Sequence, residues 1–142
     1  MISTKATIIE EGDQVCYFPS QDLIYMPDRR RSAGTEVISA ANGFCATLCH
    51  ELVHWSVAKF RLARNLTGRF GNEAYAIEGL VAELGSAFLR ADLSLSELAR
   101  VDHASYIKNW FTVLKNDKKA IFAAASKASQ AADYLQAFET VT

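Results

Sequence analysis

The run from His50 to Trp55, HELVHW, constrains this chain most, because it carries two histidines four positions apart. Residues four apart lie on the same face of an α-helix, one turn from each other. Both imidazoles can therefore reach one zinc ion, at about 2.0–2.1 Å for each Zn–N bond. Glu51 lies between them, where its carboxylate can take a proton from a water molecule that the metal activates. The run predicts a helix that carries a zinc site at His50 and His54.

This spacing is the H-E-x-x-H arrangement of zinc metallopeptidases. Two histidines at this spacing can also be ordinary core or surface side chains, since short motifs match by chance. However, the chain has only three histidines, and two of them fall in this register with apolar residues around them. We therefore favour the metal site.

The cysteines do not form a disulfide framework, because Cys16, Cys45 and Cys49 are odd in number and lack the spacing of one. Cys45 and Cys49 are four apart on the same predicted helix and could be metal ligands. We favour the other interpretation, in which they are small buried residues that let another helix approach.

Composition is that of an ordinary globular protein, with 142 residues of which 50% are hydrophobic and 22% charged. This length predicts a single domain over residues 1–142. A net charge of −1 makes nucleic-acid binding the weakest hypothesis for this chain, although it could involve Arg29–Arg31, Arg61, Arg64 and Arg69. No apolar run approaches the roughly 20 residues of a membrane span. Residues 1–30 lack a secretory signal, so we expect a cytoplasmic protein that does not engage membranes.

The first third of the chain predicts short strands, at residues 6–9, 15–18 and 22–26. The third of these, Asp22 to Met26, alternates polar and apolar residues and stops at Pro27, which is typical of an edge strand. From Glu36 onward the pattern is helical. Helices are predicted at residues 36–62, 73–91, 94 or 96 to 101, 104–114 and 116 or 117 to 138, with a loop at 65–72. The fold class is therefore α+β, with a small antiparallel or mixed sheet before a helical majority and the histidine helix at the core.

The third metal ligand is predicted on the helix after the histidine helix, because catalytic zinc usually takes three protein ligands and water. Glu83 is favoured, since it shares a helical face with small residues that allow a close approach to the histidine helix. Glu78 is the alternative, and otherwise it hydrogen-bonds a ligand histidine from outside the metal's coordination shell. The two roles could be exchanged.

A peptidase also needs a donor to the oxyanion that forms when water attacks a carbonyl group. His103 and Tyr106 are the candidates, three positions apart at a predicted helix start. Each could equally be a cap or a surface residue. Tyr75 is a weaker candidate and is expected in the core.

Five stretches occur in a fixed order over nearly the whole chain. They are YFPSQDLIYMP (17–27), CHELVHW (49–55), RLARNLTGRFGNEAYAIEGLVAELGSAFL (61–89), HASYIKNWFTVLKND (103–117) and IFAAASKASQAADYL (121–135). In these stretches the chain resembles the C-terminal zincin-like metallopeptidase domain of ArdC-type antirestriction proteins, which plasmids and other mobile elements encode. The resemblance implies a zincin-like fold, zinc bound by His50 and His54, and Glu51 as the catalytic glutamate.

The chain departs from this family in two respects. The family segment EELVAEL falls on residues 78–84, where Gly79 replaces the second glutamate and leaves Glu78 and Glu83 as possible ligands. Full-length family members also carry an N-terminal domain that binds single-stranded DNA, and this chain begins after it. We therefore expect no such domain in this chain, which is either a stand-alone form or a fragment, and we do not carry DNA binding over.

Together these features predict a zinc-dependent peptidase that acts on a protein or peptide. An extended substrate is expected to pair with the predicted edge strand, at Asp22, Ile24 and Met26. The alternative is a non-catalytic module, stabilised by zinc, that binds a restriction enzyme or another DNA-processing protein. An open coordination position on the metal would favour catalysis, and a fourth protein ligand would favour a structural ion.

Overall fold

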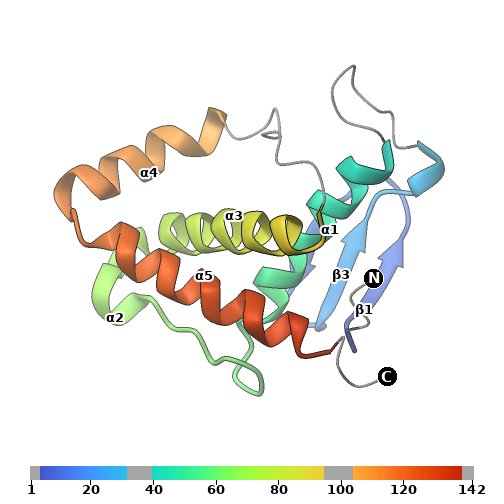
Figure 1. The fold of residues 1–142 in the computed structure, drawn as a ribbon, viewed down its shortest axis with the longest axis horizontal. Coiled ribbons are helices and arrows are strands. Elements are labelled where there is room, and N and C mark those ends of the chain that lie inside the picture. Colours follow the sequence, from blue (N-terminus) through green and yellow to red (C-terminus); the bar gives the residue numbers. More distant parts are fainter. Residues whose placement is uncertain (1–3, 32–39, 95–103, 139–142) are drawn as a thin grey trace.

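A computed structural model of the protein describes residues 4–31, 40–94 and 104–138, with a small sheet at one end and helices over the rest (Figure 1). The predicted α+β fold class, with a small mixed sheet before a helical majority, is confirmed. The elements are β1 (Thr7–Glu10), β2 (Cys16–Phe18), β3 (Leu23–Met26), η1 (Arg29–Arg31), α1 (Ala40–Trp55), α2 (Thr67–Phe70), η2 (Gly71–Glu73), α3 (Ala74–Asp92), α4 (Ala104–Asn116) and α5 (Ala120–Gln136).

The sheet has the strand order β1-β3-β2, in which β3 runs parallel to β1 and antiparallel to β2. The prediction that residues 22–26 form an edge strand is therefore wrong, because β3 is the central strand. Pro27 lies just past the last paired residue, so its missing N–H removes no ladder hydrogen bond. Ile24 and Met26 point into the hydrophobic core and are 0% exposed.

Helix α1 carries the histidine pair and passes through Asn42 and Gly43 without interruption. It ends at Trp55, seven residues before the predicted end at 62, and residues 36–39 lie outside the described part. Its last turn is closed by side chains from farther along the chain. Arg61 Nη1 donates to the Trp55 carbonyl at 2.8 Å, and Arg64 Nη2 donates to the Val53 carbonyl at 3.0 Å. Both guanidinium groups thus satisfy carbonyls that the end of a helix leaves without partners.

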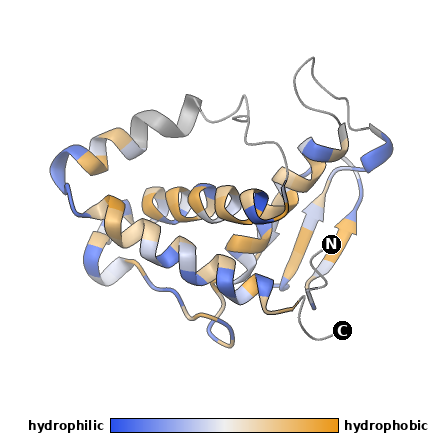
Figure 2. Ribbon diagram, viewed as in Figure 1, coloured by the Kyte–Doolittle hydropathy of each residue, from blue (hydrophilic) through white to orange (hydrophobic). Residues whose placement is uncertain are grey.

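Helix α3 lies between α1 and α5 and forms the centre of the helical layer (Figure 1). Its apolar residues show as a nearly continuous orange band in Figure 2. Ile77, Val81 and Leu89 are 0% exposed, as are Ala124 and Ala128 on the facing side of α5. The alanines of α5 allow this close packing because their side chains end at Cβ.

The other helices agree with the sequence to within a few residues. Helix α3 begins and ends one residue after its predicted bounds, and the predicted loop at 65–72 contains the short α2 and part of η2. The helix predicted to end at 101 falls almost wholly outside the described residues, which resume at 104. Among the described helices, none combines the length and apolarity that crossing a bilayer requires.

Candidate metal centre

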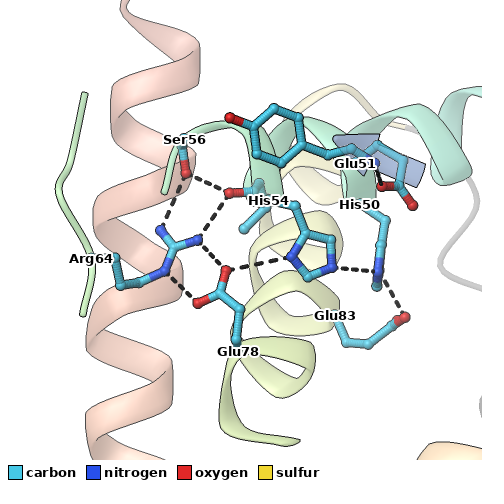
Figure 3. Close-up of polar contacts among 9 residues, drawn as sticks. His50, Glu51, His54, Ser56, Arg64, Glu78 and Glu83 are labelled. Carbon is cyan, nitrogen blue, oxygen red and sulfur yellow. Dashed lines mark hydrogen bonds and ion pairs between the residues drawn. The ribbon is translucent and has the colours of Figure 1, made fainter. Parts of the chain in front are cut away.

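The two histidines of α1 point their outer ring nitrogens at each other. Nε2 of His50 lies 3.1 Å from Nε2 of His54, and the ring centroids are 4.8 Å apart. Two nitrogens bound to one tetrahedral ion at about 2.0–2.1 Å would be separated by a similar distance. The one-turn spacing in α1 therefore brings together two donors that can share an ion (Figure 3).

Helix α3 supplies a carboxylate to the other nitrogen of each ring. Glu83 Oε1 lies 2.9 Å from His50 Nδ1, and Glu78 Oε1 lies 3.4 Å from His54 Nδ1. The contact between Glu83 and His50 has the distance of an ion pair but not the geometry of a hydrogen bond, so among the described residues His50 Nδ1 has no hydrogen-bond partner. In this arrangement both carboxylates lie beside Nδ1 and fix how the rings are turned.

Arg64 holds Glu78 from the opposite side. Its Nε donates to Glu78 Oε2 at 2.8 Å, and its Nη2 donates to Oε1. Its Nη1 also donates to Ser56 Oγ at 3.2 Å, and the Arg64 side chain is only 2% exposed. Burial alone would raise the pKa of the Glu78 carboxyl, but the hydrogen bonds from Arg64 and from the His54 ring outweigh it, so this pKa is lowered.

Glu51 is oriented by the sheet. The Tyr17 backbone N–H, on strand β2, donates to Glu51 Oε2 at 2.9 Å. This bond spans 34 positions of the sequence and attaches the catalytic candidate to the strand beside it. The Glu51 residue is 7% exposed, so its carboxylate is buried and held in place.

Both histidines, Glu51 and Glu78 line a pocket of about 460 Å³ between β2, α1, α3 and α4, whereas Glu83 and Arg64 do not. Its lining residues are Val15, Cys16, Tyr17, Pro19, His50, Glu51, His54, Val57, Tyr75, Ala76, Glu78, Gly79 and Trp110. Tyr75, expected in the core, is 84% exposed at this pocket, so that expectation is wrong. Tyr75 lies on the outward side of the first turn of α3, whereas Ile77 in the same turn is buried in the core.

The strand residues proposed for substrate contact do not line this pocket. Ile24 and Met26 are buried in the core, and the Asp22 carboxylate accepts hydrogen bonds from Arg61 and from the Tyr17 hydroxyl. The prediction of a substrate contact at Asp22, Ile24 and Met26 is therefore corrected, because a central strand offers neither a free edge nor these side chains.

Two further candidates fall where little is described. His103 lies outside the described residues, and Tyr106 lies in α4 at a position whose side chain is not described. Their oxyanion role stays a prediction. The cysteine interpretation rests on better ground, because Cys49 is 5% exposed and burial raises its pKa to about 11. Cys49 belongs to the hydrophobic core and does not line the pocket of the two histidines, whereas Cys45 is only partly buried.

Sequence reasoning missed Arg64 and Tyr17. Arg64 reads as one more charged residue in a loop, and no local pattern marks the residue whose backbone N–H will meet Glu51. A weak signal was available for Arg64, because a buried carboxylate at Glu78 requires a cationic partner somewhere in the chain.

The zincin-like metallopeptidase family profile matches residues 1–127, and the chain belongs to this family. It is 48% identical over 126 residues to protein y4eC of Sinorhizobium fredii, covering 89% of this chain and 39% of that protein. It is 37% identical over 129 residues to the DNA primase TraC of Escherichia coli, covering 91% of this chain and 12% of TraC.

The fold is similar to that of the antirestriction protein ArdC from the R388 plasmid. The Mn(II)-bound crystal structure of ArdC superposes with a TM-score of 0.78 at 37% identity, covering 96% of this chain and 49% of ArdC. The metal-free ArdC structure gives a TM-score of 0.77. The chain therefore spans less than half the length of each of these relatives.

The described residues meet only some of the requirements of a divalent-ion site. The two imidazole nitrogens suit such an ion by distance and chemistry. Within the described part of the chain, however, no third histidine, cysteine, aspartate or glutamate completes a group of three donors around one point.

Proposed function

We propose that this domain hydrolyses peptide bonds with a zinc ion bound by His50 and His54. The observation that supports it best is the pair of Nε2 atoms 3.1 Å apart, with the buried Glu51 in the same pocket. Zinc bound there would lower the pKa of water towards neutrality and polarise the carbonyl group to be attacked.

Glu51 is proposed as the general base, taking a proton from the attacking water and passing it to the leaving amine. The hydrogen bond from the Tyr17 N–H keeps its carboxylate facing the pocket. Glu78 and Glu83 keep the imidazoles turned towards each other, and such carboxylates also make ligand nitrogens more basic. His103 and Tyr106 remain the proposed donors to the oxyanion.

We propose that an extended substrate pairs with strand β2, in place of the β3 pairing that the sequence predicted. Strand β2 is at the edge of the sheet, pairs only with β3 among the described strands, and lines the pocket through Cys16 and Tyr17. An extended peptide added along this edge would cross the pocket in front of the two histidines, beside Tyr17, whose own N–H is already bonded to Glu51.

The test is the variant Glu51→Gln, assayed with zinc on an unfolded protein substrate. The amide keeps the shape of the side chain but cannot take a proton, so we expect zinc content to be retained and cleavage to fall by at least about a hundredfold. Undiminished cleavage would remove Glu51 from the mechanism. Glu11→Gln, an exposed carboxylate on the far side of β3, is the matched control.

A second candidate is a module that binds a protein without cutting it. Two observations favour it: among the described residues no third donor completes the metal site, and the fold is similar to that of ArdC, an antirestriction protein. For either activity, we propose that the protein acts in antirestriction or in another function of a mobile element. If wild type cleaves the substrate and the Glu51→Gln variant does not, the peptidase is favoured.

A further inference from the structure

The carboxylates of α3 lie on the wrong side of the imidazoles to bind the shared ion. The two Nε2 atoms face each other, whereas Glu83 contacts His50 at Nδ1 and Glu78 contacts His54 at Nδ1. Carboxylates at this second nitrogen of a metal-binding histidine commonly orient the ring instead of binding the metal. Glu78 and Glu83 therefore lie where they can position the imidazole rings, and not where they can bind the ion (Figure 3).

Glu78 is also held in that place by Arg64. Two guanidinium nitrogens bind its two oxygens, and the Arg64 side chain is 2% exposed. If Glu78 turned towards the metal, the buried guanidinium group would lose its carboxylate partner, which is costly in the interior. Glu78 is thus poorly suited to be a ligand.

Gly79 occupies the position that a third ligand would need. It lies one turn before Glu83 on the same face of α3 and lines the same pocket as His50 and His54. A Cβ atom built at Gly79 meets only Trp110 Nε1, at an ordinary contact distance of 3.6 Å. The pocket therefore has room for a longer side chain at this position.

We propose that Gly79 is the vacant third-ligand position of this metal centre, and that within the described part of the chain only His50 and His54 hold the ion. This inference rests on the proposed function, since it presumes that the histidine pair binds a metal. Coordination positions beyond the two imidazoles are then filled from outside the described residues, by oxygen donors such as water or a substrate carbonyl. Metal bound in this way exchanges readily.

The test is zinc affinity, measured by competition with a chromogenic chelator, for the variants Gly79→Glu and Gly79→Gln. Glutamate supplies a carboxylate ligand, whereas glutamine fills the same space without the charge. We expect Gly79→Glu to bind zinc at least about tenfold more tightly than wild type, the low end of the effect of supporting groups on metal affinity. We expect Gly79→Gln to match wild type, and Gly79→Asp provides a second carboxylate if the glutamate variant does not fold.

Two outcomes would overturn the proposal, and they separate it from the proposed function. If wild type binds zinc and neither carboxylate variant binds more tightly than Gly79→Gln, the third ligand is already present and Gly79 is not its position. The peptidase proposal would survive that result. If wild type and both folded carboxylate variants bind no zinc, the histidine pair is not a metal site and both proposals fall.

Discussion

At the scale of single residues, a hydrogen-bond network beside the candidate metal centre joins Asp22, Tyr17 and Arg61. The Tyr17 hydroxyl donates to Asp22 Oδ1 at 3.0 Å, and Arg61 donates to Asp22 Oδ2. The Arg61 guanidinium carbon also stacks 3.6 Å from the centroid of the Trp55 ring. This network ties the turn before β3 to the end of the histidine helix, so Asp22 acts on stability.

The variant Asp22→Asn tests this role by chemical denaturation of the metal-free protein at several pH values. The hydrogen bond from Arg61 lowers the pKa of the Asp22 carboxyl below its usual 3.8, against a smaller opposing effect of burial. Stability from this carboxylate is therefore present above about pH 4 and is lost as the pH falls through the lowered pKa. We expect the variant to lose about 1 kcal/mol at pH 7, an amount reduced by the partial exposure of Asp22.

The loss should shrink as the pH falls below about 4 and through the lowered pKa of Asp22, because the wild-type carboxylate is then progressively protonated. Asparagine tolerates the φ of 54° at this position, so the backbone is not a confounding cause. A loss that stays constant with pH would contradict the ion-pair explanation, and a changed substrate KM would point back to the original interpretation of Asp22 as a substrate contact.

Residues that share a local pattern could be predicted from the sequence, and their distant partners could not. His50, Glu51 and His54 are defined by spacing within one helix. The donor to Glu51 is 34 positions away, and the partner of Glu78 is 14 positions away in a loop. Such pairings depend on how the elements pack, which no local spacing records.

At the scale of elements, α3 carries two glycines with opposite surroundings. A Cβ atom at Gly85 would lie 2.9 Å from Val53 Cγ2 and 3.2 Å from Val53 Cγ1, whereas one at Gly79 meets nothing closer than 3.6 Å. Val53 is β-branched and 0% exposed, so it has little freedom to move away. Gly85 is therefore required for the close approach of α1 and α3.

The matched pair Gly85→Ala and Gly79→Ala separates helix propensity from packing. Alanine favours a helix over glycine by about 0.5–1 kcal/mol, so we expect Gly79→Ala to stabilise the metal-free protein by about that amount. For Gly85→Ala we expect a net loss of about 1–2 kcal/mol, because overpacking outweighs the gain. Denaturant unfolding measures both, and stabilisation by both substitutions would show that the two helices can separate without cost.

Helix positions followed from the sequence more closely than strand order. The 3.6-residue period placed α3 within one residue, since burying one face requires that period. The end of α1 was misplaced because Arg61 and Arg64 close it from beyond the helix. Strand β3 was misplaced because alternation and Pro27 fit an edge strand, yet β2 pairs with its other side.

At the scale of the whole molecule, burial is unevenly distributed. Helix α3 has eight buried residues and contacts both α1 and α5. Over residues 110–116, where its side chains are described, α4 buries only Val113 and leaves Phe111 68% exposed. Figure 1 shows α4 at the periphery, away from the sheet. The centre and this outer helix should therefore differ in local stability.

Native-state hydrogen exchange would measure this difference. We expect amides in the middle of α3 to exchange only through global unfolding, because its neighbours must leave first. Amides at 110–116 should exchange through smaller, local openings at lower free energy. Equal protection of α4 and α3 would show that the outer helix is fully integrated into the cooperative unit.

The two arginines that close α1 also have a consequence for the length of the connection that follows. Between Trp55 and Thr67 the chain turns back on itself, with Leu62 N–H bonded to the Ser56 carbonyl and Arg64 N–H to the Val57 carbonyl. Each guanidinium group reaches its carbonyl only from its present register. Adding or deleting a residue here would shift both guanidinium groups and break the hydrogen bonds from Arg64 to Glu78. This connection is thus a poor place for grafted peptides or affinity tags, although surface loops usually accept them.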